Sequence, residues 1–165
     1  MTDLFRFPNP VNEVSARLVA GGVVLMSLAY VATGWTPLLV AIAYGFIARL
    51  LMGPRLSPLG LLVTRVITPR LRLAARPVPG PPKRFAQGVG VVFSLTAAIL
   101  AVGFEAPLAA RAVIGMLAAA ATLESAFGLC LGCKLFAWLM RRGFVPAEVC
   151  ATCADITVRA RPLRT

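Results

Sequence analysis

Long apolar runs alternate with short polar or basic segments along most of the chain. Runs that can cross the hydrocarbon core of a bilayer need about 20 helical residues. Four runs approach or exceed this length, at residues 14–34, 36–52, 86–104 and 108–140. The pattern therefore predicts an all-α integral membrane protein built as a bundle of four spanning helices.

The sequence between the second and third runs is basic and rich in proline. Residues 57–67 have apolar positions at helical spacing but are too few to span, which predicts a short helix along the membrane surface. Residues 76–82 form a proline-rich linker that is not expected to be helical, because proline removes amide donors and restricts the residue before it. We expect one membrane domain over residues 1–143, divided into two hairpins by this linker, and a cytosolic tail over residues 144–165.

Composition and charge agree with a membrane protein and give its orientation. Hydrophobic residues make up 59% of the 165 residues, and the formal net charge is +11. Most Lys and Arg residues lie at one end of the predicted spans, whereas the two opposite turns carry only Arg111. Because short basic loops stay in the cytoplasm, both termini are predicted there, beside anionic lipid. No aromatic residues are interleaved with the basic cluster, so a nucleic-acid partner is not expected.

All the cysteines belong to two C-x-x-C pairs. Cys130 and Cys133 are expected one turn apart on one face of the fourth span where it leaves the membrane, and Cys150 and Cys153 follow in the tail. A permanent structural disulfide is not expected in the cytosol. We interpret the pairs as a dithiol relay that passes reducing equivalents or sulfane sulfur, a thiol–disulfide oxidoreductase or sulfur-relay component. Cys133 and Cys150 are the predicted attacking thiols, and Cys130 and Cys153 resolve.

Other roles for these residues stay open. The spacing of the two pairs also suits a four-thiolate zinc site formed by Cys130, Cys133, Cys150 and Cys153, which would shape a docking surface. Zinc is the one cofactor that the residues suggest. The cysteines are also small enough to be packing residues at a helix interface. A small four-span protein with many small residues also suits a homo-oligomer or an accessory subunit of a larger membrane complex.

Glu124 is an acidic residue within the fourth predicted span. Placed near mid-membrane, it is expected to face the bundle interior, because a lone carboxylate is costly in lipid. Hydrogen bonds to serine or threonine, or pairing with a basic residue that reaches inward, would stabilise it. Its role is either a proton or substrate contact or a neutral link between helices. A continuous helix would point Glu124 and Cys130 to different sides, so we expect no direct pair.

Several enzyme classes are excluded by what the sequence lacks. There is no histidine, which removes His-dependent nucleophile pairs and His-containing metal sites. No phosphate-binding loop and no dinucleotide fingerprint occurs. Thiol chemistry, metal–thiolate binding and transport remain as molecular activities.

Four segments carry a resemblance to a known family. They are residues 57–61, residues 68–71, the Phe-Ala-Gln box within residues 82–90, and the Gly-x-Cys-x-Gly-Cys box within residues 126–133. The chain resembles the bacterial membrane family of unknown function numbered 4395 over most of its length. The resemblance implies a small helical protein of the bacterial inner membrane whose relatives often occur alongside thioredoxin-like and rhodanese-like proteins. Such soluble proteins are therefore the expected partners.

Overall fold

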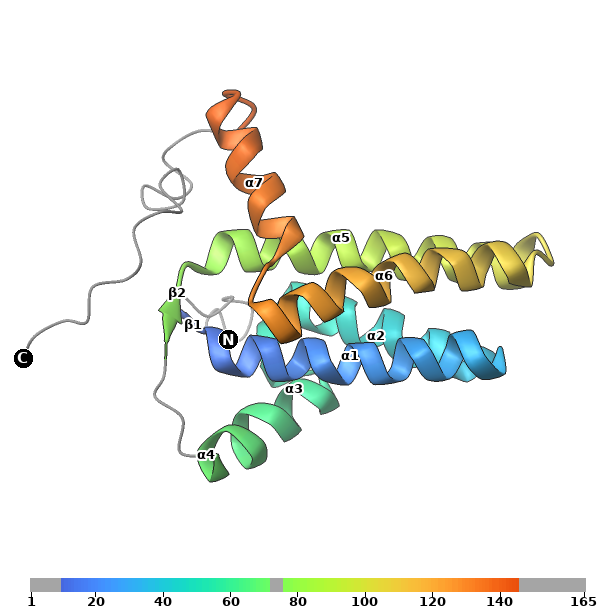
Figure 1. Cartoon of the computed structure of the whole chain (residues 1–165), viewed down its shortest axis with the longest axis horizontal. Coiled ribbons are helices and arrows are strands. Elements are labelled where there is room, and N and C mark those ends of the chain that lie inside the picture. The colour runs from blue at the N-terminus through green and yellow to red at the C-terminus, as the bar shows by residue number, and fades with distance from the viewer. Residues whose placement is uncertain (1–9, 72–75, 146–165) are drawn as a thin grey trace, which may run out of the picture.

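The computed structural model describes residues 10–71 and 76–145, and it shows a bundle of long helices lying side by side (Figure 1). The long helices are α1 (Glu13–Thr33), α2 (Thr36–Met52), α5 (Gly80–Ala98, continued by the π-helical turn η4, Ile99–Gly103) and α6 (Pro107–Phe127). Each lies in a segment long and apolar enough to cross a membrane. The predicted all-α bundle with four spanning helices is confirmed.

Local sequence explains where the first hairpin begins and turns. Asn12 caps α1, and its side-chain oxygen accepts a hydrogen bond from the Val14 amide at 3.1 Å. Gly34 ends α1 in the left-handed conformation, with φ of 70°, and its amide donates to the Tyr30 carbonyl at 2.7 Å. This turn and the one at residues 104–106 lie at the same end of the bundle, which we call the hairpin end (Figure 1).

A short antiparallel ladder joins the two hairpins at the opposite end. Strand β1 (Val11–Asn12) pairs with β2 (Pro77–Val78), with Val11 opposite Val78. We call this the ladder end. The proline-rich linker differs from its prediction, because α5 already begins at Gly80 and includes Pro81 and Pro82 in its first turn. Proline is tolerated there, since the first amides of a helix have no intrahelical partner.

A second, shorter helical path leaves the bundle after α2. It comprises η2 (Gly53–Arg55), α3 (Pro58–Leu62), the π-helical η3 (Val63–Ile67) and α4 (Thr68–Arg70). The path diverges from the long helices toward the ladder end (Figure 1). A helix is thus present over the predicted residues 57–67 and extends to Arg70, while its placement along a membrane surface stays a prediction.

The main helix pairs connect the first hairpin with the second. Helix α1 packs chiefly on α6, and α2 packs chiefly on α5. Small residues permit these close contacts: Gly90 of α5 lies under the Phe46 ring of α2, and Gly21 of α1 lies beside the Ser125 hydroxyl of α6. The core contains Val23, Tyr30, Leu39, Ile42, Phe46, Ala97, Ala110, Ile114, Leu117 and Ala121. Much of the outer surface is apolar and exposed in the isolated chain, as lipid contact requires.

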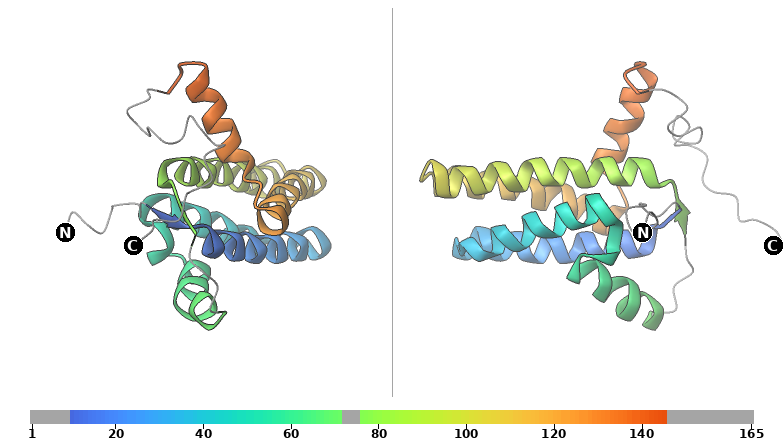
Figure 2. Two further views of the ribbon diagram at one scale, coloured as in Figure 1. Left: turned by 60° about the vertical axis from the view of Figure 1, so that its left-hand side comes forward. Right: turned by 180° about the vertical axis from the view of Figure 1, so that it is seen from behind.

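The fourth predicted span is divided. The sequence predicts one helix over residues 108–140, but α6 ends at Phe127 and a separate helix, α7 (Leu131–Arg141), runs steeply across the bundle direction (Figure 2). Gly128 causes the break, because it adopts φ of 69° and closes the end of α6 with hydrogen bonds back to that helix. The Arg17 side chain donates to the carbonyls of Ser125 and Ala126, which stabilises this helix end.

Candidate dithiol site

The first cysteine pair forms the beginning of α7. Cys130 is the N-cap residue of this helix and Cys133 is its third residue. The Cys133 backbone amide donates a hydrogen bond to the Cys130 sulfur at 3.3 Å. Both are free thiols; Cys130 is only 7% exposed, and Cys133 is half-buried. The two cysteines are thus one turn apart, as expected, but they belong to the start of α7 and not to a continuous fourth span, because α6 ends at Phe127.

Contacts between α5 and α7 hold the pair in place. Gly132 lies so close to Ala86 that a β-carbon at Gly132 would be 2.7 Å from the Ala86 Cα. One turn further on, the Phe136 ring packs on the Phe85 ring with centroids 5.6 Å apart. The Phe-Ala-Gln box and the Gly-x-Cys-x-Gly-Cys box are thus in contact, and this contact packs the start of α7 on α5.

An ion pair lies beside the thiols. The Lys83 ammonium of α5 donates to the Glu124 carboxylate of α6 at 2.6 Å, and both side chains are largely buried. Lys83 interacts electrostatically with Cys130 and Cys133 as well. Glu124 lies in the last turn of α6 rather than at mid-membrane, because the span ends at Phe127. After the break at Gly128, Cys130 is still close enough to Glu124 for an electrostatic interaction, while the carboxylate itself pairs with Lys83.

Arg49 of α2 adds a second buried cation to this cluster. It is 5% exposed, donates to the Gln87 side-chain oxygen at 2.9 Å and to the Ser57 hydroxyl at 3.1 Å, and interacts electrostatically with Glu124. Its guanidinium also lies over the Phe46 ring, 4.7 Å from the centroid. The cluster of Arg49, Lys83, Glu124 and the two thiols thus holds two basic side chains and one carboxylate among the described residues. An anionic sulfur would balance the remaining positive charge.

The two thiols are not equivalent. The pKa of Cys130 lies below its ordinary value, and the main cause is a hydrogen bond from the Cys133 thiol. Lys83 also lowers this pKa, whereas burial and the Glu124 charge raise it by less than the total lowering. The same hydrogen bond, with burial, raises the pKa of Cys133 well above its ordinary value. The position of Cys130 at a helix N-terminus favours the thiolate in the same direction. Cys130 is therefore the sulfur that this site prepares as an anion.

Three residues at this site were not singled out from the sequence: two members of the cluster and the partner of one of them. Lys83 belongs to the basic connection, Arg49 lies near the end of an apolar run, and Gln87, which accepts from Arg49, is part of the Phe-Ala-Gln box, so each has an ordinary structural explanation. The signal available for Lys83 was the need of Glu124 for a basic partner. Of the partners suggested for Glu124, Ser94 and Thr122 instead donate to carbonyls of their own helices.

The second cysteine pair lies outside the described residues. Val145 is the last residue that the structure describes, and Cys150 and Cys153 follow it in the sequence. Within residues 10–71 and 76–145, His, Cys, Asp and Glu side chains form no group of three or more that could hold a metal ion. The four-thiolate zinc site stays a prediction.

Comparison with known families gives one result that agrees with the resemblance noted from the sequence. Residues 11–141 match a family described as "Domain of unknown function (DUF4395)". The match includes all four spanning helices, α7 and the first cysteine pair, and it ends before Cys150. Comparisons with curated proteins and with solved structures find no match.

Proposed function

The chain belongs to the DUF4395 family, whose description names no activity, and we propose that it is a membrane-embedded dithiol protein. Cys130 and Cys133 pass reducing equivalents or sulfane sulfur to and from a soluble thioredoxin-like or rhodanese-like protein. The observation that carries the proposal is the polarised pair at the start of α7, where the Cys133 amide and thiol both donate to the Cys130 sulfur. In this arrangement one sulfur is prepared to attack and its neighbour to resolve.

We assign to the first pair roles that are the reverse of those expected from the sequence, on the basis of the unequal surroundings of the two sulfurs. The Cys130 thiolate attacks a disulfide of the partner, forms a mixed disulfide and displaces one partner thiolate. Cys133 then loses its proton and attacks the Cys130 sulfur, which closes the Cys130–Cys133 disulfide and releases the second partner thiolate. Two electrons pass from the dithiol to the partner. Attack of Cys130 on a partner persulfide instead moves the terminal sulfur to Cys130 and leaves a partner thiol.

The neighbouring charges have roles in these steps. Lys83 stabilises the anionic Cys130, either as thiolate or as persulfide, and Arg49 adds to the positive potential. Glu124 holds Lys83 in place through their ion pair, beside the two sulfurs. Cys150 and Cys153 exchange with the first pair in this scheme.

The proposed location is the cytoplasmic face of the bacterial inner membrane. Among the described residues, the basic side chains gather at the ladder end, and Arg111 lies at the hairpin end. Under the positive-inside rule this distribution supports a cytoplasmic location of the ladder end, the dithiol and both termini. A cytosolic thioredoxin-like or rhodanese-like partner can approach there.

Trapping of the mixed disulfide tests this proposal. In a Cys150→Ser/Cys153→Ser background, the Cys133→Ser variant should accumulate a mixed disulfide with glutathione at Cys130, detected by mass spectrometry of the purified protein. The intact first pair should instead close its internal disulfide, and Cys130→Ser should react more slowly than either. Equal reactivity of Cys130→Ser and Cys133→Ser would contradict the polarised pair.

Elemental analysis of the wild-type protein tests the alternative. Stoichiometric zinc that is lost in the Cys150→Ser/Cys153→Ser variant, with thiols freed only by chelator, would replace the relay by a docking module with a structural metal. Thiols that appear after reductant or cyanide, in metal-free protein, support disulfide or persulfide chemistry.

A further inference from the structure

Helix α7 has a second apolar face that none of the described residues, 10–71 and 76–145, covers. Its inner face buries Phe136, Ala137 and Met140, and the Phe136 ring packs on Phe85 of α5. Its outer face presents Leu131, Leu135 and Trp138, which are 47%, 44% and 47% exposed. These three positions follow the spacing of one helical stripe.

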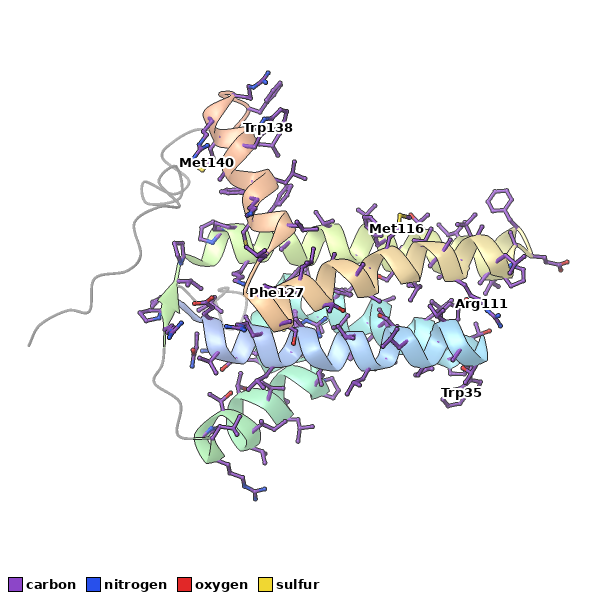
Figure 3. All side chains as sticks on the ribbon, viewed as in Figure 1. Trp35, Arg111, Met116, Phe127, Trp138 and Met140 are labelled. Carbon is purple, nitrogen blue, oxygen red and sulfur yellow. The ribbon has the colours of Figure 1, made fainter. Side chains whose placement is uncertain are left out.

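The Trp138 position of the stripe faces along the four long helices. α7 leaves the bundle at the level where the spanning helix α6 ends, and it runs steeply across the bundle direction (Figure 2). Trp138 lies on the side of α7 that faces along the bundle toward the hairpin end, whereas Met140 lies on the opposite side (Figure 3). A bilayer around the four spans would therefore meet α7 on its Trp138 side.

The charges on α7 suit an acidic surface. Lys134 and Arg141 lie on its exposed part, and Arg142, which follows it, places its guanidinium over the Trp138 ring, 5.0 Å from the centroid. The helix contains no acidic residue. Exposed basic residues beside a row of leucine and tryptophan are typical of helices that lie in the interface of membranes with anionic lipids.

We infer that α7 lies in the headgroup layer of a bilayer that contains acidic phospholipids. Leu131, Leu135 and Trp138 enter the upper acyl region, and Lys134, Arg141 and Arg142 contact lipid phosphates. This interaction does not depend on the proposed dithiol chemistry. Its consequence is that the start of α7, and with it Cys130, is held at the depth of the headgroups.

Fluorescence of Trp138 tests the inferred depth. The chain has two tryptophans, so Trp35→Phe leaves Trp138 as the single emitter. In vesicles of phosphatidylcholine and phosphatidylglycerol, lipids brominated in the upper acyl chain should quench Trp138 more than lipids brominated near the chain ends, and aqueous acrylamide should quench it weakly. Strong acrylamide quenching without bromolipid quenching would overturn the inference, as would the strongest quenching at the bilayer centre. Protection from both quenchers would also overturn it, since that would place a protein surface over α7.

Removal of the basic side chains tests the inferred contact of α7 with acidic phospholipids. In the Trp35→Phe background, Lys134→Gln/Arg141→Gln/Arg142→Gln should reduce bromolipid quenching and shift Trp138 emission to the red in phosphatidylglycerol vesicles. The control is Arg65→Gln/Arg70→Gln, which removes two charges from η3 and α4, and it is compared charge for charge with Lys134→Gln/Arg141→Gln; this control should leave Trp138 emission and quenching unchanged. If the triple variant behaves as its parent in phosphatidylglycerol, contact with acidic headgroups is wrong.

Discussion

Single residues set the difference between the two thiols. The Cys130 sulfur accepts hydrogen bonds from Cys133, lies at a helix N-terminus and interacts with Lys83. Each of these contacts stabilises a negative charge on the same sulfur. The polarity of the pair thus depends on neighbours that can be replaced one at a time.

The lowered pKa of Cys130 predicts a shifted pH profile. Because the thiolate is the reactive form, alkylation of Cys130 by iodoacetamide should reach half of its maximal rate below the ordinary cysteine value of about pH 8.5. Cys133→Ala and Lys83→Met each remove a group that lowers this pKa, so each should move the midpoint upward. Peptide mass spectrometry of the Cys150→Ser/Cys153→Ser protein measures the profile at Cys130. An unchanged midpoint in Cys133→Ala would argue against the hydrogen bond between the thiols.

Substitutions of Lys83 and Glu124 should have strongly coupled effects on the free energy of unfolding, because the two side chains form an ion pair. Removal of one partner leaves the other charge buried, so Lys83→Met and Glu124→Gln should each lower the free energy of unfolding by about 3 kcal/mol, the lower end for buried pairs. The double variant should lose less than the sum of the two, because neither unpaired charge remains. Denaturation of the detergent-solubilised protein gives the free energy of unfolding of each variant in this double-mutant cycle. Lys134→Met is the control at an exposed lysine. Additive losses would mean that the two charges do not stabilise each other.

At the scale of elements, the close contact of α5 and α7 positions the thiols. Gly132 faces the backbone of Ala86 with no room for a side chain. The same contact places Phe136 on Phe85 and keeps the start of α7 beside Lys83. A change in this contact should therefore act on the site without touching a sulfur atom.

Substitution of Gly132 tests this contact. Gly132→Ala should destabilise the protein by about 1–3 kcal/mol through overpacking, and it should slow mixed-disulfide resolution because Cys133 is displaced. A smaller residue at position 86 would not relieve the clash, because the Ala86 Cα itself would lie 2.7 Å from the new β-carbon. Gly143→Ala offers a comparison after α7, where a β-carbon meets nothing within 4 Å although the positive φ makes alanine strained. If Gly132→Ala resolves the mixed disulfide as fast as its parent, the contact is not what positions the pair.

The sequence predicts these elements unevenly, for physical reasons. The spans beginning at Glu13 and Thr36 follow from the length of apolar runs, which lipid imposes directly. The end of α6 does not follow from an apolar run, because residues 127–132 continue the apolar and small-residue pattern. One glycine in the left-handed conformation, Gly128, makes the break. The Lys83–Glu124 pair joins residues 41 positions apart and depends on the packing of α5 on α6, which no local pattern encodes.

On the scale of the whole molecule, the described basic residues are distributed unequally between the two ends. The ladder end combines them with the start of α1, the start of α5 and the end of α6, whereas Arg111 lies beside Gly34 at the hairpin end. This asymmetry supports one orientation across the membrane.

Accessibility in intact cells checks this orientation. With all four cysteines replaced by serine, a Phe104→Cys variant should react with a membrane-impermeant maleimide from outside, because Phe104 is 71% exposed at the hairpin end. A variant that retains only Cys130 should be protected until the cells are permeabilised. The opposite pattern would place the dithiol outside the cytoplasm and would contradict the proposed partners.

The pairing of α1 with α6 and of α2 with α5 has a consequence for biosynthesis. Neither hairpin that emerges from the ribosome contains its own principal packing partner, so the bundle forms only after the last span has been synthesised. Lys83 is synthesised before Glu124, its partner, and Cys130 follows both in the sequence. The surroundings of the Cys130 sulfur come from α5, α6 and α7, so they are complete only after these three helices have been synthesised and packed.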